Sequence, residues 1–185
     1  MKLEIITKFI YILETIPAMK RALFIGRFQP LHNAHLKVIK DITKENDQII
    51  IGIGSSQEKN TLENPFSYRE RRAMIEKVLR NNNLSSYRII SIPDYFDDEK
   101  WCKHIKENIK NIDAVYSGNL YVLKCLKLYG FNTKKIKLVN GISSTRIRKM
   151  ISENKQWKGL VPREIADFIK KAGGAERIKN PFKSA

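Results

Sequence analysis

Two histidines in the segment GRFQPLHNAH, His32 and His35, are the residues whose types and spacing point most directly to chemistry. They follow a turn that contains Gly26, and they flank the expected first turn of a helix that begins near Asn33. The unpaired backbone N–H groups of such a turn, and the positive end of the helix dipole, favour an anion. Arg27 brings a guanidinium to the same rim. A single histidine would suggest a helix cap, but the pair beside a glycine turn predicts a phosphate-binding site.

The segment ISSTRIR, residues 142–148, offers a second helix start. Ser143 or Ser144 is a good N-cap, and the hydroxyls and N–H groups of Ser143 and Thr145 lie at the same helix start. Arg148 lies about one turn into the helix, from where it can reach back over a phosphate. Taken alone, this is a common helix opening with an exposed arginine. Together with the histidine segment, it predicts two helix N-termini that converge on one anion.

The elements that must position these residues are apolar runs of strand length that alternate with segments of helical periodicity. Because buried parallel strands read as short apolar runs, this alternation predicts an α/β fold with a doubly wound parallel sheet of five strands and helices on both faces. The expected strands cover residues 22–26, 48–54, 87–93, 114–118 and 136–139 with its flank. A C-terminal helical end includes a last helix from about Pro162 to a stop at Gly173–Gly174.

Each expected strand is followed by a segment more polar than a plain turn requires. In doubly wound sheets, ligands bind in the crevice at the carboxyl ends of the strands. The polar segments are GRFQPLHNAH, GSSQEKN, DYFDDEKW, SGN and NGISSTRIR. We therefore expect one site assembled from all of these loops.

Composition limits the class of protein. The 185 residues carry 35 Lys and Arg against 19 Asp and Glu, a formal charge of +16 that attracts nucleotides, nucleic acid or anionic membrane without choosing among them. The length suits one well-buried domain, which we place at residues 20–185. Cys102 and Cys125 lack the spacing of a metal site and suggest free thiols in a reducing, cytoplasmic compartment. No apolar run reaches the ~18 residues that a membrane span needs.

The N-terminal extension, residues 1–19, allows two interpretations. Charged residues such as Glu4 interrupt its apolar stretch and no small-residue cleavage site follows, so it does not have the pattern of a signal peptide. Ile5 and Phe9 fall at helical spacing, which favours an extra helix. Met19 stands directly before the first strand, which equally favours an artefact of start-codon choice.

The histidine segment and ISSTRIR together resemble the paired signature of the nucleotidylyltransferase superfamily, (H/T)-x-G-H and I-S-S-T-x-(I/L)-R. The finer resemblance is to archaeal-type nicotinamide-nucleotide adenylyltransferases, and it spans about residues 20–180. The motifs GRFQP-x-H, IGIGS-x-Q, TLENPF, ER, YSGN and W-x-x-LVP occur in that order at residues 26–32, 51–57, 61–66, 70–71, 116–119 and 157–162. Short motifs give false matches singly, but this many in register are specific.

The resemblance implies a Rossmann-like fold and transfer of AMP from ATP to nicotinamide mononucleotide (NMN), which forms NAD and pyrophosphate. It implies a catalytic set of His32, His35, Arg148 and Arg27. The implied ATP-binding residues are Gly26, Arg27, Phe28, His32, His35, Ile142, Ser143, Thr145 and Arg148. The implied NMN- or NAD-binding residues are Gly54, Ser55, Asp94, Trp101 and Asn119, with Trp101 stacked on the pyridine ring. A homo-oligomer, often a hexamer, is also implied.

Such a reaction needs no protein nucleophile, because the attacking group is already a phosphate anion. The protein has to hold two polyanions in line and stabilise the charge that spreads onto the leaving pyrophosphate. Mg²⁺ would be held through ATP phosphates and water rather than by side chains.

Ala34 departs from the motif, which has glycine at this position. An alanine in a helix fits and stiffens the backbone, whereas at a point of close nucleotide approach its methyl group would crowd the ligand. Two alternative functions remain. A sibling nucleotidyltransferase would use phosphopantetheine or a flavin mononucleotide as acceptor, against which TLENPF, YSGN and W-x-x-LVP argue. A non-catalytic nucleic-acid-binding protein on the same fold would need basic residues on one face with exposed aromatics, whereas the aromatics here fall mostly at core spacing.

Overall fold

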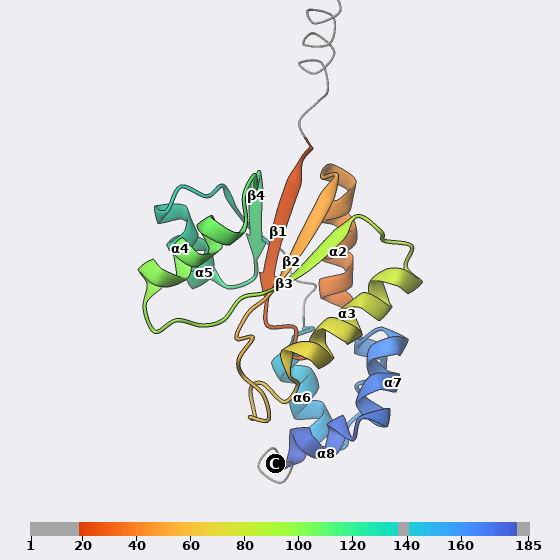
Figure 1. Cartoon of the computed structure of the whole chain (residues 1–185). Coiled ribbons are helices and arrows are strands. Elements are labelled where there is room, and N and C mark those ends of the chain that lie inside the picture. The colour runs from red at the N-terminus through yellow and green to blue at the C-terminus, as the bar shows by residue number, and fades with distance from the viewer. Residues whose placement is uncertain (1–18, 137–140, 181–185) are drawn as a thin grey trace, which may run out of the picture.

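The computed structural model describes residues 19–136 and 141–180, which form a five-stranded parallel sheet with helices on both faces (Figure 1). The strand order is β3-β2-β1-β4-β5. The strands are Arg21–Gly26 (β1), Gln48–Ile53 (β2), Tyr87–Ser91 (β3), Ala114–Ser117 (β4) and Thr133–Lys135 (β5). The chain leaves β1 toward one edge of the sheet and later returns toward the other, so the predicted doubly wound α/β fold is confirmed.

Alternate side chains of the central strand β1 enter two separate cores. Ala22 and Phe24 join the core on one face of the sheet, whereas Leu23 and Ile25 join the core on the other. All four side chains are buried. Because both faces of β1 are covered, its sequence is a continuous apolar run rather than an alternating one.

Helices from successive crossovers cover the two faces. On one face lie Asn33–Glu45 (α2) and Tyr68–Asn81 (α3), and on the other Asp98–Asn108 (α4) and Leu120–Leu128 (α5) (Figure 1). The chain continues through Ser144–Ser152 (α6), a 3₁₀ turn at Lys158–Leu160, Arg163–Lys171 (α7) and Gly174–Lys179 (α8). These last helices pack with α3 and with one another, which confirms the predicted C-terminal helical end.

Polar caps set the starts of several of these helices. Ser67 and Glu70 form a reciprocal capping box at α3, and the Asp97 carboxylate accepts the N–H of Lys100 at α4. Ser143, one of the two serines expected to cap α6, accepts the N–H of Arg146 at 3.1 Å. Each cap satisfies one of the N–H groups that a helix start leaves unpaired.

Two expected elements are placed differently in the structure. The fifth strand, expected over 136–139 with its flank, is described at Thr133–Lys135, because its position is set by pairing with Val115–Ser117 of β4 and not by an apolar pattern of its own. Residues 137–140 lie outside the described residues. The glycine stop does end α7, but Gly173, at φ 60°, turns the chain into the further helix α8.

The extension over residues 1–18 lies outside the described residues, so neither interpretation of it is tested. Within residues 19–136 and 141–180, none of the helices has the length and apolar character that crossing a membrane requires.

Candidate active site

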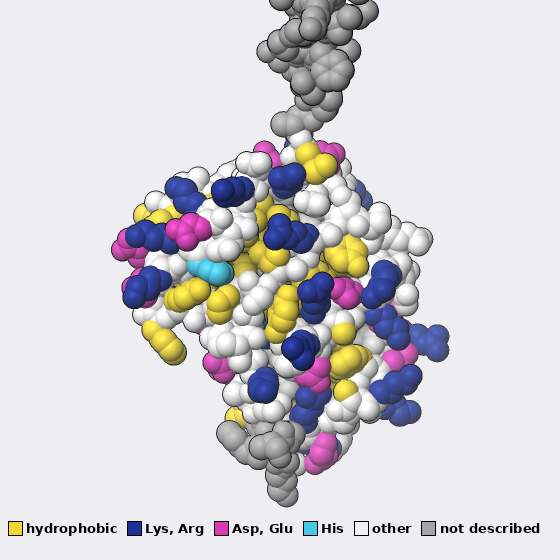
Figure 2. Space-filling model, viewed as in Figure 1, with side chains coloured by type: hydrophobic (Ala, Val, Ile, Leu, Met, Phe, Trp, Pro, Cys, Tyr) yellow, Lys and Arg dark blue, Asp and Glu magenta, His cyan; other side chains and the backbone are white. Residues whose placement is uncertain are grey.

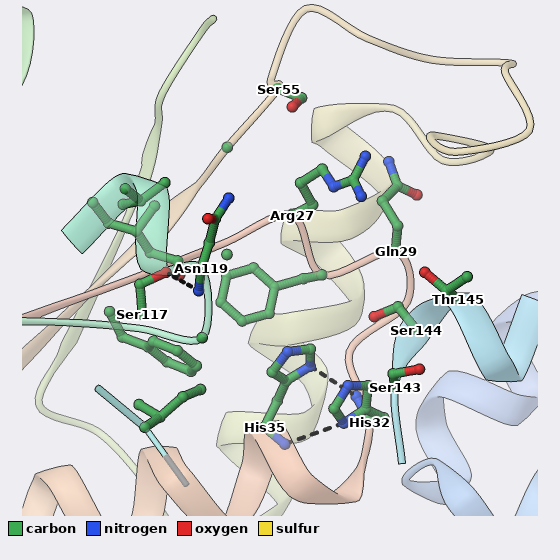
Figure 3. A pocket seen from close by; sticks show the side chains of 18 of the residues that line it. Arg27, Gln29, His32, His35, Ser55, Ser117, Asn119, Ser143, Ser144 and Thr145 are labelled. Carbon is green, nitrogen blue, oxygen red and sulfur yellow. Dashed lines mark hydrogen bonds between the residues drawn. The ribbon is translucent and has the colours of Figure 1, made fainter. Parts of the chain in front are cut away.

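A cavity of about 610 Å³ opens at the carboxyl ends of the strands, beside the starts of α2 and α6 (Figure 3). It lies at β1, where the strand order reverses: the chain passes from β1 to β2 and β3 on one side and later returns to β4 on the other. This is the position at which doubly wound sheets bind ligands. The residues predicted for the site that line it are Gly26, Arg27, Phe28, His32, His35, Gly54, Ser55, Asp94, Trp101, Asn119, Ser143, Thr145 and Arg148.

Ile142 is the exception among the residues predicted for the site. It packs, partly buried, against the core on the α2 face instead of lining the cavity. Its apolar side chain fits that core, which leaves the wall of the cavity to its polar neighbours. The predicted place of Ile142 in the ATP site stays a prediction.

The two histidines cap α2 with each other. His32 Nδ1 accepts the backbone N–H of His35 at 3.3 Å, and His35 Nδ1 accepts the backbone N–H of His32 at 3.4 Å, drawn as dashed lines in Figure 3. The two rings stack with centroids 3.6 Å apart and planes 16° from parallel. This is a capping box in which imidazoles take the places of Ser and Glu.

The capping box determines which ring nitrogen can serve a ligand. An Nδ1 atom that accepts a hydrogen bond carries no proton, so in the neutral ring the proton is on Nε2. Burial lowers the pKa of His32 to about 4. Burial, and second the charge of His32, hold the pKa of His35 well below its ordinary value. At neutral pH the pair therefore offers two uncharged Nε2–H donors, not two cations.

A ring of Phe28 fills the space behind the histidines. It packs edge-on against His35 at 4.9 Å and against Phe24 at 5.3 Å. Gly26 lies directly under it, since a Cβ there would be 3.1 Å from Phe28 Cζ. The glycine thus makes room for Phe28, which provides an apolar backing for the imidazole pair.

Ala34 is 1% exposed and is not among the residues that line the cavity. It lies in the first turn of α2, where alanine has the most favourable helix propensity. Its methyl group is covered by protein. The alanine that replaces the motif glycine therefore does not reduce the width of the cavity.

The second helix start, at α6, is anchored to the loop after β1. Ser144 Oγ donates to the Pro30 carbonyl at 2.9 Å, and Ser143 is occupied as the cap. Arg148 is 8% exposed; its Nη1 donates to the Gln29 carbonyl at 2.9 Å and its Nε to the Leu62 carbonyl at 3.0 Å. Its guanidinium is thus fixed at the cavity wall.

Arg27 is the more exposed of the two arginines that line the cavity. Its side chain is 44% exposed, and its Nη1 lies 2.7 Å from the Glu63 carboxylate, itself 72% exposed. The hydrogen bond from Arg27 lowers the pKa of Glu63. The arginine at this rim is therefore already paired, and a phosphate would compete with Glu63 for it.

Gln29 was missed by the sequence analysis. Only 1% exposed, it lines the cavity, donates from Nε2 to the Phe66 carbonyl at 2.7 Å and accepts the Phe66 N–H at 3.1 Å. Phe66 in turn is covered by α8, since a Cβ on Gly174 would be 2.8 Å from its ring. Arg177 of α8 lies over the same ring and pairs with Glu70 at 2.7 Å. The sequence signal was the polar residue within GRFQP, whose partner is 37 positions away.

Ser117, at the end of β4, was also missed. Its Oγ donates to the Ile25 carbonyl at 3.1 Å and accepts the N–H of Asn119 at 3.2 Å (Figure 3). Asn119 Oδ1 accepts the N–H of Tyr121 and so caps α5. Other lining residues not predicted are Phe24, Ile25, Gly118, Val122, Ile136 and Ser144.

The wall formed by the β2, β3 and β4 loops is more open. Asp94 and Asn119 are exposed and Trp101 is half-buried, packed on the core formed with α4 and α5. Ser55, at φ 46°, is mostly buried. Asp94 is the only carboxylate among the cavity-lining residues, and the described residues contain no group of three or more His, Cys, Asp or Glu side chains that could hold a metal ion.

Comparisons with known proteins agree with this geometry. The cytidylyltransferase-like family model matches residues 23–150. Curated relatives named nicotinamide-nucleotide adenylyltransferase include one from Methanococcus aeolicus, 43% identical over 161 residues, covering 86% of this chain and 93% of the relative. Another, from Pyrobaculum aerophilum, is 38% identical over 166 residues, covering 87% of this chain and 93% of the relative.

A solved structure gives the fold independently. A bifunctional NMN adenylyltransferase/ADP ribose pyrophosphatase from Francisella tularensis, complexed with AMP and a manganese ion, matches 88% of this chain with a TM-score of 0.74 at 22% identity. The chain spans about half of that protein, 52% of its length. With the family match and the archaeal relatives, the conclusion is that this chain belongs to the cytidylyltransferase-like family, among its archaeal-type nicotinamide-nucleotide adenylyltransferases.

Proposed function

We propose that this chain transfers the adenylyl group of ATP to the 5′-phosphate of NMN, forming NAD and pyrophosphate. The observation that carries the proposal is the cavity at which two capped helix starts, α2 and α6, face the loops after β1, β2 and β4. The names of the archaeal relatives supply the two substrates. The described residues within 20–185 would act as a single nucleotidyltransferase domain.

The histidine pair and Arg148 would hold the triphosphate. Their two Nε2–H groups and the N–H groups of Arg148 not bonded to carbonyls are donors already fixed in place. Fixed donors need no reorganisation as charge moves onto the leaving pyrophosphate. Ser143, Thr145 and Arg27 would complete the phosphate contacts, with Gly26 and Phe28 at the base of the same wall.

The chemistry is a direct in-line displacement. An oxygen of the NMN phosphate attacks the α-phosphorus of ATP, and the bond from that phosphorus to the oxygen bridging to the β-phosphate breaks. The nucleophile is already an anion, so no side chain has to remove a proton from it. What the chain contributes is alignment of the two nucleotides and stabilisation of the departing charge.

The acceptor would occupy the more open wall. Trp101 would stack on the nicotinamide ring, while Gly54, Ser55, Asp94 and Asn119 would contact the amide, ribose and phosphate. The half-buried indole provides the flat apolar surface that stacking needs.

A magnesium ion would enter this cavity bound to the nucleotide. Asp94 is the only carboxylate among the described residues that line the cavity, so a divalent ion would be held through phosphate oxygens and water. When bound, Mg²⁺ neutralises part of the triphosphate charge. A manganese ion accompanies AMP in the Francisella protein. We further propose a cytoplasmic homo-oligomer, because the resemblance to archaeal-type adenylyltransferases implies one, often a hexamer. Light scattering would test the oligomeric state.

Two alternative functions differ from this proposal in the acceptor substrate or in the distribution of basic residues. A sibling enzyme would use phosphopantetheine or flavin mononucleotide as acceptor. A nucleic-acid-binding protein would gather its basic residues along one groove, whereas Figure 2 shows Lys and Arg spread over the whole visible face.

The experiment is a product assay. The purified chain is incubated with ATP, Mg²⁺ and, in parallel, NMN, nicotinate mononucleotide, phosphopantetheine or flavin mononucleotide, and products are followed by mass spectrometry. NAD and pyrophosphate formed fastest with NMN support the proposal. Product from another acceptor alone would replace the substrate, and no product with ATP still bound would contradict the enzymatic assignment.

A further inference from the structure

Arg71 is a buried cation that belongs to the ER motif at residues 70–71, but neither the motif nor the proposed mechanism gives it a role. It lies in the first turn of α3 and is 0% exposed. It does not line the cavity, so its charge and its hydrogen bonds must serve a group within the protein. Burial lowers its pKa to about 10, and the charge of Arg27 contributes to that lowering. The guanidinium therefore remains protonated at neutral pH.

The guanidinium of Arg71 joins two loops of the site. Nη1 donates to the carbonyl of Arg27 at 2.9 Å and to the carbonyl of Gly54 at 2.8 Å. Nη2 donates to the carbonyl of Ser55 at 3.0 Å. Arg27 follows β1 and belongs to the wall assigned to ATP, whereas Gly54 and Ser55 follow β2 and belong to the wall assigned to NMN. One side chain thus holds both walls.

This link begins where the sheet stops joining the two loops. The last hydrogen bond between them is from Gly54 N–H to the Gly26 carbonyl, 2.9 Å long. Immediately beyond it, Phe28 and Ser55 have positive φ angles of 51° and 46°, a backbone conformation that is uncommon for residues other than glycine. Arg71 donates to the carbonyl of Ser55 itself and to the carbonyls of the residues that precede Phe28 and Ser55. Its planar fork of donors suits this task.

Resting on the proposed function, we infer that Arg71 is a positioning residue that sets the separation of the ATP-binding and NMN-binding loops. It touches neither substrate. Each loop can bind its own nucleotide without Arg71, but the attacking oxygen and the α-phosphorus meet only if the two loops keep their spacing. A displacement of about 1 Å far from the reacting atoms is enough to cost about 100-fold in rate.

The product NAD provides a readout that a merely structural role would not change selectively. NAD contacts both loops at once, whereas ATP and NMN each depend mainly on one. In Arg71→Lys the ammonium keeps the charge but cannot reach all three carbonyls in the same geometry. We expect NAD affinity and kcat each to fall tenfold or more, while the affinities for ATP alone and NMN alone change less than threefold.

The measurements are isothermal titrations with ATP, NMN and NAD and steady-state kinetics, on the wild-type chain, Arg71→Lys, Arg71→Met and the control Arg72→Met. Arg72 is the next residue of the same helix, with a half-exposed side chain paired to Glu76 at 2.8 Å. The control should match wild type within twofold. Titration stoichiometry reports the fraction of folded chains, so that a loss of kcat is not mistaken for a loss of protein.

Three results would overturn the inference. The first is that Arg71→Lys loses affinity equally for ATP, NMN and NAD. The second is that Arg71→Lys matches Arg72→Met in kcat and in all three affinities. The third is that neither Arg71 variant folds, which would leave Arg71 a purely structural role. Failure of the proposed function is recognised separately, in the wild-type chain. A wild type that makes no NAD removes that function and this inference with it.

Discussion

The two walls of the cavity are built differently. The wall assigned to ATP includes buried groups whose hydrogen bonds are already made: Gln29 and His32 are each 1% exposed, and Arg148 is 8% exposed. The wall assigned to NMN carries exposed Asp94 and Asn119 beside a half-buried indole. The buried groups of the first wall are held by contacts within the protein, whereas Asp94 and Asn119 of the second wall are open to solvent.

The difference matches what each wall has to do. The triphosphate wall must stabilise charge that moves during the reaction, and donors that are already oriented do this without reorganising. The acceptor wall has only to recognise and align a nucleotide. We expect rigidity to matter for turnover at the first wall and contact area to matter for affinity at the second.

Arg148→Ala tests the fixed wall most severely. Removing this cation should cost roughly 2–4 kcal/mol of transition-state stabilisation, or about 30- to 1000-fold in kcat, with a smaller loss of ATP affinity. Steady-state kinetics and ATP titration give both quantities. Equal losses in kcat and in ATP affinity would mean that Arg148 binds ground state and transition state alike.

Acid should lower the stability of the fold through the two histidines of the same wall. A group whose folded pKa lies below its unfolded value stabilises the fold above that unfolded value, and the stability is lost as the pH falls toward the folded pKa. For His32, with a pKa of about 4 against the ordinary 6.5, the loss between pH 6.5 and 4 amounts to roughly 3 kcal/mol. His35 changes stability in the same direction.

Urea unfolding at pH 7.5, 6 and 5 checks this expectation. His32→Asn keeps an oxygen that can cap α2 but does not titrate, so its stability should fall less steeply with acid than that of wild type. Parallel curves for the two proteins would show that the imidazole pair does not govern acid stability.

Trp101→Ala tests the open wall. Base–aromatic stacking is worth roughly 1–3 kcal/mol, so the KM for NMN should rise about 5- to 150-fold while ATP affinity stays within about twofold. Trp101→Phe keeps an aromatic ring, so its KM for NMN should lie between those of wild type and Trp101→Ala. A change in ATP affinity as large as that in KM for NMN would mean that the two walls are not independent.

Glu63→Gln should act in the opposite direction and weakly. The carboxylate occupies Arg27 before ATP arrives, and exposed ion pairs of this kind are worth about 0.2–1 kcal/mol. Its removal should tighten ATP binding up to about fivefold. Glu58→Gln, in the same loop, controls for the loss of charge alone. Weaker ATP binding in Glu63→Gln would show that the carboxylate assists the nucleotide.

Sequence predicted those parts of the fold and site that depend on local pattern. Buried strands and the helix starts at His32 and Ser143 carry their signal within a few residues. What was missed depends on partners far along the chain: Gln29 pairs with Phe66, and Arg71 with carbonyls on two loops. The amino-acid sequence alone does not reveal such long-range contacts.

The fifth strand shows the same limit for the backbone. Thr133–Lys135 has no apolar character, and it is a strand because β4 offers it a free edge. The motif correctly placed the histidines at a helix start, where they line the cavity, and their phosphate binding stays a prediction. Their mutual capping, and hence their neutral state and the nitrogen left for a ligand, follow only from the geometry of the two rings.

The contact of α8 with Phe66 and Glu70 also has a consequence for the order in which the chain is made. Four strands of the sheet precede residue 120, so they leave the ribosome well before α8. The helix that covers Phe66, and through it supports Gln29, comes at Gly174–Lys179. A nascent chain can thus form most of its core early. Its nucleotide site is completed only as translation of these last described residues ends, so activity should emerge in one late step.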